Sequence, residues 1–192
     1  MEHAFSEQPE SQPTRAEWIT GIGTPLVTQF RSYLADEAEV DRLVKRYRTY
    51  QNAHHDELTR CYPGVRDAVR KLHERGHPMA VVTSKTNELA NRSLAHVGLA
   101  PYIPLVVGVE STTRHKPDPE PVRFALEQLH ATLDGAVFIG DSPHDIAAGN
   151  AAGVSTVAAL WGAFSRQALA AAHPHHFLDR IEDLDALLAS HR

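Results

Sequence analysis

The sequence predicts an α/β fold in which helices cover both faces of a parallel sheet. From about residue 62 onward, short apolar segments of strand length alternate with segments whose apolar residues recur at helical spacing. The strand segments are continuously apolar, which is typical of parallel strands buried on both faces. Glycines follow several helical segments, among them Gly76, Gly98 and Gly153, where a left-handed residue commonly ends a helix.

Composition and charge exclude several classes of protein. The 192 residues are 42% hydrophobic and 22% charged, which fits one globular domain or one core with a small added unit. A formal net charge of −5 argues against a nucleic-acid-binding surface and against binding to an anionic membrane. No apolar run has membrane-spanning length, no basic segment precedes an apolar run at the N-terminus, and Cys61 has no second cysteine to pair with. We therefore expect a cytoplasmic protein, and the sequence indicates no particular oligomeric state.

The N-terminal residues are predicted to be irregular. Residues 1–17 are polar and rich in Glu, Gln and Pro, which favours a flexible lead-in with room for one helical turn at Glu2–Phe5. A glycine-bearing loop is expected to follow over Trp18–Leu26. Its glycines at 21 and 23 do not make a dinucleotide-binding fingerprint, because Leu26 occupies the third glycine position and no strand precedes them.

Helical patterns without strands continue to about residue 61. One helix is predicted to begin at Pro25, and a second over residues 37–58, with acidic residues in its first turns and basic residues later. The sequence Tyr-Pro-Gly at 62–64 then breaks the chain. We therefore expect a small helical unit over residues 18–61 and an α/β core over residues 62–192.

The core is predicted from apolar spacing and from β-branched segments. Right-handed crossovers should place the carboxyl ends of its strands at one edge of the sheet, where ligands bind in open α/β folds. In order, the predicted elements are helix Val65–Arg75, strand Met79–Thr83, helix Asn87–Val97, strand Leu105–Val109, helix Glu120–His130, strand Ala136–Ile139, a helix ending at Gly153, strand Thr156–Leu160, helix Arg166–Ala172, a weak strand His176–Leu178 and a closing helix Ile181–Leu188.

Two carboxylates follow the apolar segment Ala136–Ile139. Gly140 ends this strand, Asp141 lies in the turn beyond it, and Asp145 lies near the start of the next helix. Like charges brought together raise a carboxyl pKa, and the usual compensation is a hard divalent cation such as Mg2+. Alternatively, Asp141 forms the turn and Asp145 caps the helix, where its charge meets the positive end of the helix dipole.

Polar side chains also follow two other predicted elements. Thr83 and Ser84 come directly after a strand and before a helix, where hydroxyl and backbone N–H groups suit an anionic oxygen, or where one of the two hydroxyls caps the helix. Lys116 lies beside prolines that hold the backbone extended, or is a solvated lysine, and Asp118 is predicted to cap the helix that follows. A hydroxyl, an ammonium and a carboxylate-held metal together suit phosphoryl transfer.

These motifs resemble those of the haloacid dehalogenase (HAD) superfamily, especially its phosphoglycolate-phosphatase-like branch with a helical cap. Residues 81–85 (Val-Val-Thr-Ser-Lys) resemble the second motif of the family, residues 116–119 (Lys-Pro-Asp-Pro) the third, and residues 140–145 (Gly-Asp-Ser-Pro-His-Asp) the fourth. The alanine-rich run that ends at Gly153 is typical of that branch. The resemblance extends from about Trp18 to the C-terminus and implies an HAD-like Rossmannoid parallel sheet with a helical cap.

The resemblance implies a role for each motif residue. Thr83 would bind the phosphoryl group, and Lys116 would neutralise that group and the nucleophile. Asp141 would ligate Mg2+, and Asp145 would hold a metal-bound water or Lys116. In the family an aspartate attacks phosphorus, the aspartyl-phosphate is then hydrolysed, and a second aspartate acts as general acid and base.

Three further residues complete the predicted substrate-binding set. Ser84 shares the loop of Thr83, and the cap-loop residues Gly23 and Thr24 are candidates for substrate selection, with a plain turn as the equal alternative. The implied partner is a small phosphorylated metabolite. Phosphoglycolate is one candidate, and the same branch contains pyrophosphatases and sugar-phosphate phosphatases.

The sequence departs from the family at the first motif. That motif is an N-terminal apolar strand ending in Asp-x-Asp-Gly-Thr, whereas no aspartate precedes Asp36 here, and Asp183-Leu-Asp185 lies in a helical pattern without Gly-Thr. We expect that the chain begins inside the first cap helix and lacks the central strand between those ending at Thr83 and Asp141. Two apolar strand edges would then lose their partner.

Two functional hypotheses follow. The first is a Mg2+-dependent HAD-type phosphatase whose start is mis-set or whose chain is truncated, so that the 192 residues as written are inactive. The second is a non-catalytic phosphate-binding or regulatory protein on the same fold. A hydrolytic dehalogenase is less favoured, because it needs the same absent aspartate. Whether the chain is an enzyme is therefore open from the sequence.

Overall fold

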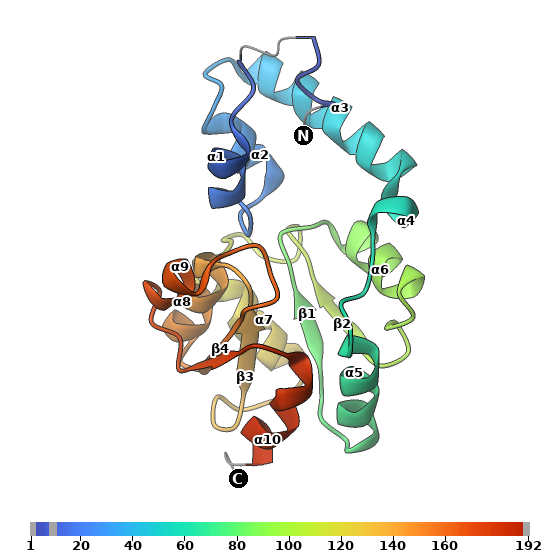
Figure 1. Ribbon diagram of the computed structural model, residues 1–192, viewed down its shortest axis with the longest axis vertical. Coiled ribbons are helices and arrows are strands. Elements are labelled where there is room, and N and C mark those ends of the chain that lie inside the picture. The colour runs from blue at the N-terminus through green and yellow to red at the C-terminus, as the bar shows by residue number, and fades with distance from the viewer. Residues whose placement is uncertain (1–2, 8–10, 190–192) are drawn as a thin grey trace.

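A computed structural model describes residues 3–7 and 11–189 of the protein (Figure 1). Helices and strands alternate from residue 65 onward, as the sequence predicts, and most observed elements end within two residues of the predicted bounds. In chain order the elements are α1 (Arg15–Thr20), α2 (Leu26–Arg31), α3 (Glu37–Ala53), α4 (His55–Leu58), α5 (Val65–Glu74), β1 (Ala80–Val82), α6 (Asn87–His96), β2 (Leu105–Val107), α7 (Glu120–Gln128), β3 (Val137–Gly140), α8 (Pro143–Ala152), β4 (Ser155–Ala159), α9 (Arg166–Ala170), β5 (His176–Leu178), a 3-10 turn (Ile181–Asp183) and α10 (Leu184–Ala189).

The strands form two parallel sheets. β1 pairs with β2, so that Val81 lies opposite Val106, and β4 lies between β3 and β5. A helix lies in each connection between paired strands, as parallel pairing requires. Among the described residues no hydrogen-bonded ladder joins β1 to β3. The expected absence of a strand between them stays a prediction.

Strand β4 is buried on both faces, which explains why its sequence is continuously apolar. Val157 is fully buried among residues of α5, β5 and the C-terminal elements, whereas the adjacent Ala158 is fully buried against Ile146 of α8 and Leu169 of α9. Successive residues of a strand point to opposite faces, so these contacts place helices on both sides of the sheet. The predicted layer architecture is therefore confirmed.

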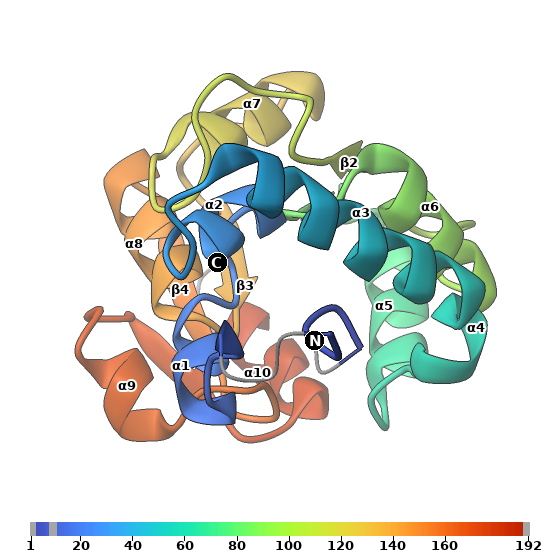
Figure 2. The same ribbon diagram turned by 90° about the horizontal axis from the view of Figure 1, so that it is seen from above.

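Helices α1 to α3 form a separate helical layer beyond the carboxyl ends of the strands (Figures 1 and 2). This layer has its own apolar core, in which Trp18 packs edge-on against Phe30 with ring centroids 5.5 Å apart. The fully or nearly buried members of this core are Ala4, Phe5, Phe30, Val40, Leu43 and Val44.

The N-terminal residues are more ordered than the sequence predicts. The described residues 3–7 form a turn, not part of a helix, and Phe5 is fully buried with its ring stacked 5.7 Å from that of Phe30. Glu2 lies outside the described residues. The expected flexible lead-in is therefore wrong for the described residues 3–7, because Ala4 and Phe5 are buried in the helical core and Arg46 of α3 contacts Ser6 and Glu7.

Two helix boundaries also differ from prediction. The helix α1 occupies part of the expected lead-in and loop, and it starts with a capping box in which Thr14 Oγ1 accepts from Glu17 N–H and Glu17 accepts from Thr14 N–H. The Thr-x-x-Glu spacing is a helix start signal, and it was overlooked because the segment is polar and rich in proline. The long second helix instead stops at Ala53, and His54 separates it from the short α4.

Candidate functional site

A buried ion pair joins the third and fourth predicted motifs. Lys116 Nζ lies 2.6 Å from Asp145 Oδ1, and both side chains are only 8% exposed. The same ammonium donates to the Val82 carbonyl at 3.3 Å, at the end of β1. Lys116 therefore links the end of β1, in the first sheet, to the first turn of α8, which follows β3 of the second sheet. The alternative of a solvated lysine is wrong.

Asp145 also takes part in capping α8. Ser142 is the N-cap residue: its Oγ accepts from Asp145 N–H at 3.2 Å and donates to Asp145 Oδ2 at 2.7 Å, while Ser142 N–H donates to the same oxygen. The capping interpretation of Asp145 is therefore confirmed, and its role as a site carboxylate stays a prediction. A Cβ at Gly140 would lie 2.1 Å from Asp145 Cβ, so only glycine allows this approach at the end of β3.

Asp141 directly follows β3, and its charge is less compensated by neighbouring groups than that of Asp145. Its Oδ2 accepts from Ala163 N–H at 3.3 Å, and it forms no ion pair with any residue that the structure describes. Burial, and next the nearby charge of Asp145, raise the pKa of Asp141, while the backbone N–H groups and Lys116 lower it less. A Cβ at Gly162 would lie 2.2 Å from Asp141 Cβ, so the loop after β4 also closes on this carboxylate.

The loop after β1 presents Thr83 and Ser84 at the same edge. Thr83 Oγ1 accepts from Lys85 N–H at 3.2 Å, and Ser84 Oγ donates to the Gly23 carbonyl at 2.5 Å. The N-cap of α6 is Thr86, whose side chain accepts from Leu89 N–H. The alternative in which Thr83 or Ser84 caps this helix is therefore wrong. The Thr83 hydroxyl is bonded within the loop, and the Ser84 hydroxyl is bonded to the Gly23 carbonyl.

The structure brings the N-terminal glycine loop against this site. Gly23 has φ of +102°, and a Cβ there would lie 2.5 Å from Ser142 Oγ and 3.4 Å from a ring carbon of His144. Its neighbour Thr24 donates from its hydroxyl to the Gly21 carbonyl at 2.8 Å, as in an ordinary turn. Gly23 thus lies beside the predicted site residues, whereas Thr24 is engaged in local structure.

The carboxylates suit a hard cation only in part. Asp141 offers an oxygen donor, whereas both oxygens of Asp145 are engaged by Lys116 and Ser142. Within the described part of the chain, no group of three His, Cys, Asp or Glu side chains is arranged to hold a metal. Mg2+ accepts one or two carboxylates and keeps several waters, so Asp141 fits as one ligand of an incomplete set. Asp145 fits better as the residue that holds Lys116.

Sequence reasoning missed Ser142 as a site residue. Its side chain is fully buried, and it fixes one oxygen of Asp145 while Lys116 takes the other. Its position three residues before an acidic residue and just before Pro143 is the ordinary start signal of a helix. That signal could have identified Ser142 from the sequence. Asp118, by contrast, is not the N-cap of α7, which is Pro119, but its side chain accepts from the first helical N–H, that of Glu120, at 2.9 Å.

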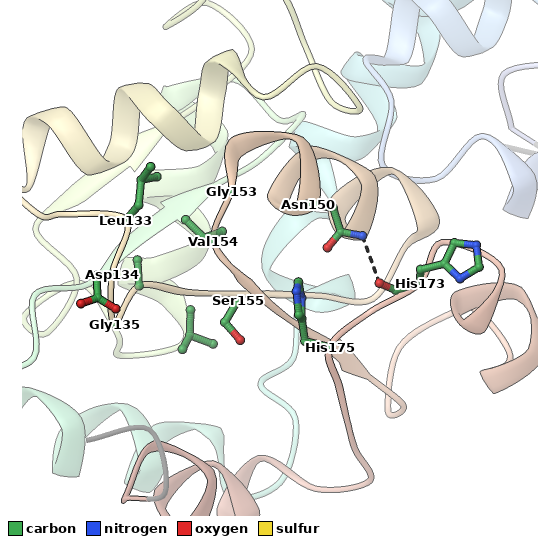
Figure 3. A pocket seen from close by; sticks show the side chains of 11 residues that line it. Leu133, Asp134, Gly135, Asn150, Gly153, Val154, Ser155, His173 and His175 are labelled. Atoms are coloured by element: carbon green, nitrogen blue, oxygen red, sulfur yellow. Dashed lines mark hydrogen bonds between the residues drawn. The ribbon is translucent and has the colours of Figure 1, made fainter.

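A separate cavity of about 570 Å3 lies at the amino ends of the strands of the second sheet (Figure 3). Asp134 before β3, Ser155 at the start of β4, and His173 and His175 before β5 line it. Asn150 also lines it and donates to the His173 carbonyl at 3.0 Å. The ion pair lies at the carboxyl ends of the strands and this cavity at their amino ends. The cavity therefore does not belong to the candidate site.

A model of the haloacid dehalogenase-like hydrolase family matches residues 1–159. The chain belongs to this family. It is 33% identical over 186 residues to the pyrophosphatase PpaX of Anoxybacillus flavithermus, covering 97% of this chain and 86% of that protein. It is 34% identical over 180 residues to the pyrophosphatase PpaX of Listeria monocytogenes serotype 4a, covering 94% and 82%.

The fold of this HAD-family chain also matches solved structures. A crystal structure from Haemophilus somnus, described as a predicted phosphoglycolate phosphatase, superposes with a TM-score of 0.85 at 21% identity, covering 96% of this chain and 88% of that one. At this identity the match supports the fold alone. Among the described residues, no helix combines the length and the apolar character needed to cross a bilayer.

Proposed function

We propose that this HAD-family chain carries the phosphoryl-binding site of a phosphatase that acts on a small phosphorylated metabolite. The observation that carries the proposal is the buried Lys116–Asp145 pair, held at the carboxyl ends of the strands beside Asp141. A buried ion pair is costly to form, and a site for a phosphoryl group needs a cation held in one position. The family and its pyrophosphatase relatives support the same reaction class.

Each residue has a definite part in the proposal. Thr83 presents its hydroxyl and Ser84 its backbone N–H to the phosphoryl oxygens, and Lys116 neutralises their charge. Asp145 and Val82 fix the ammonium in place. Residues 18–61 form a cap, and residues 62–192 form the core.

Mg2+ is the proposed cofactor, with Asp141 as a ligand. When bound, the ion supplies charge neutralisation and orients the phosphoryl group. Asp145 acts by holding Lys116, because its oxygens are already engaged. Gly23 brings the cap loop against the site and so limits the size of the substrate.

The substrate class is inferred from relatives. The relatives named pyrophosphatase favour a small anion with a phosphoryl group and a second charged group. The absence of any aspartate from residues 1–35 leaves the described site without a candidate nucleophile of the family kind. We therefore propose that the 192 residues alone bind such an anion in the cytoplasm without turning it over.

Calorimetry and a turnover assay on the same sample test this proposal. We expect inorganic phosphate with Mg2+ to bind the wild-type chain, Lys116→Met to abolish binding, and Lys45→Met, on the exposed side of α3, to leave it unchanged. Hydrolysis of p-nitrophenyl phosphate and pyrophosphate should stay at the level of buffer. Robust hydrolysis that Asp141→Asn removes would contradict the inactivity, and failure of a folded, monodisperse sample to bind phosphate would remove the anion site.

A further inference from the structure

A second cluster of polar side chains lies outside the site, where α4 meets α6 (Figures 1 and 2). His55, at the start of α4, is only 3% exposed. Its Nδ1 lies 2.6 Å from Asp56 Oδ1, and its Nε2 lies 2.8 Å from Ser93 Oγ of α6. Arg92 Nη2 also contacts Asp56 at 3.1 Å, and Arg92 Nη1 donates to the Asn52 carbonyl. Helix α6 therefore holds the chain as it leaves the helical layer.

The hydrogen bonds of this cluster can be satisfied with His55 neutral or charged. A carboxylate only accepts, so His55 Nδ1 carries a proton that it donates to Asp56. With a neutral ring, Ser93 donates its hydroxyl proton to Nε2. With a charged ring, Nε2 donates to Ser93 Oγ, and the hydroxyl turns to the Leu89 carbonyl, which lies 2.8 Å away. In both states a buried histidine keeps two partners, so the contact between α4 and α6 persists.

The cluster continues to the anion-binding loop through Lys85. Lys85 Nζ donates to Ser93 Oγ at 3.4 Å, and Lys85 N–H donates to Thr83 Oγ1 at 3.2 Å. On the other side, Ser84 Oγ donates to the carbonyl of Gly23 in the helical layer. Of the two residues after Thr83, Ser84 is thus bonded to the α1–α2 loop of the helical layer, and Lys85 is bonded to Ser93, the partner of His55 at the start of α4.

The atoms of Ser93, His55 and Asp56 are spaced like a nucleophile with its base and orienting acid, but the surroundings do not support that chemistry. Ser93 lies inside α6, where its backbone N–H belongs to the helix and is not free to stabilise an oxyanion. The side chains of Lys85, Arg92 and His96 also crowd the cluster. A structural coupling explains these contacts better than a second catalytic centre.

We propose that His55 and Ser93 are positioning residues for the Thr83–Lys85 loop, so that anion binding at Thr83 and the attachment of α4 to α6 depend on each other. The proposal rests on the proposed function, because it assigns the coupling to the same phosphoryl site. Its physical basis is that a loop held in its binding-competent form binds more tightly than a loop that samples others. Loss of the Ser93 contact frees the Lys85 side chain, so that the loop samples conformations other than the binding-competent one.

Amide exchange of the ligand-free protein tests the loop directly. Ser93→Ala removes the hydroxyl oxygen that His55 and Lys85 both contact, and alanine suits the interior of a helix. His55→Asn retains a hydrogen-bonding group near the position of Nδ1 but loses the one near the position of Nε2. Each variant should exchange the amides of residues 83–86 about threefold to tenfold faster, as the loss of one hydrogen bond predicts, while β4 exchanges as in wild type. His55→Gln, which retains a group near Nε2, and the adjacent His54→Gln should stay near wild type.

Calorimetry with inorganic phosphate and Mg2+ then tests the coupling. Ser93→Ala and His55→Asn should each weaken binding by about threefold to tenfold, and the double variant should be no worse than either single variant. Unchanged exchange and affinity in both variants would overturn the proposal, as would faster exchange throughout the chain in place of the loop alone. Faster loop exchange in a protein that binds no phosphate would support the loop coupling and remove the proposed function instead.

Discussion

The Lys116–Asp145 pair allows a quantitative test of how the site is held together. Lys116→Met removes the ammonium and retains most of the apolar side chain. At 2.6 Å, the two charges attract by about 6 kcal/mol with an effective dielectric constant of about 20. Desolvation offsets much of this gain, and loss of one partner of a buried pair typically costs about 3–5 kcal/mol. Because Ser142 still donates to Asp145, we expect a loss near the lower end, about 3 kcal/mol.

Urea unfolding followed by circular dichroism measures this loss at neutral pH. The matched control is Lys45→Met on α3, an exposed lysine, whose free energy of unfolding should change by no more than about 0.5 kcal/mol. The double variant Lys116→Met with Asp145→Asn should recover part of the loss, because no uncompensated charge remains. A loss below about 1 kcal/mol for Lys116→Met, or no recovery in the double variant, would refute the reasoning that charge compensation holds this site.

Three further predictions concern Asp141, Mg2+ and the N-terminal segment. The raised pKa of Asp141 means that the folded protein binds this proton more tightly than the unfolded chain, so stability falls as pH rises from the ordinary carboxyl pKa through the folded value. Asp141→Asn should therefore raise the urea midpoint at neutral pH and leave it unchanged below the ordinary carboxyl pKa; a lower midpoint at neutral pH would contradict this. Mg2+ should raise the thermal midpoint of the wild-type protein but not of Asp141→Asn, measured by scanning fluorimetry, and equal shifts would remove Asp141 as a ligand. Phe5→Ala should cost about 3–5 kcal/mol in urea unfolding, because the ring is fully buried, and a cost below about 1 kcal/mol would show that the segment is not packed.

Local patterns predicted most of the core correctly because they are set by neighbouring residues. The apolar run over 136–139 and the helix that ends at Gly153 appear in the structure as β3 and α8. The prediction that Asp118 caps the next helix is one residue off: Pro119 is the N-cap of α7, and Asp118 accepts from the N–H of Glu120. Spacing and capping act over a few residues, so a single sequence contains them in full.

Predictions failed where distant contacts decide the outcome. Phe5 lies in a polar segment, and its stacking on Phe30, together with the burial of Ala4, makes that segment part of the helical core. The two hydroxyls after β1 were equally compatible with helix capping, and it is Thr86 that caps α6. Each of these outcomes depends on which surfaces meet in space, and composition or local spacing does not encode that information.

The sequence by itself determined the α/β architecture, the order of the motifs and the residue types available for a phosphoryl site. Only the tertiary structure decided that Lys116 pairs with Asp145, that Ser142 shares this pair, and that β1 and β3 lie in separate sheets. The physical reason is the range of the forces involved: periodicity and capping are local, whereas the burial of a charge and the pairing of strands depend on residues brought together by folding.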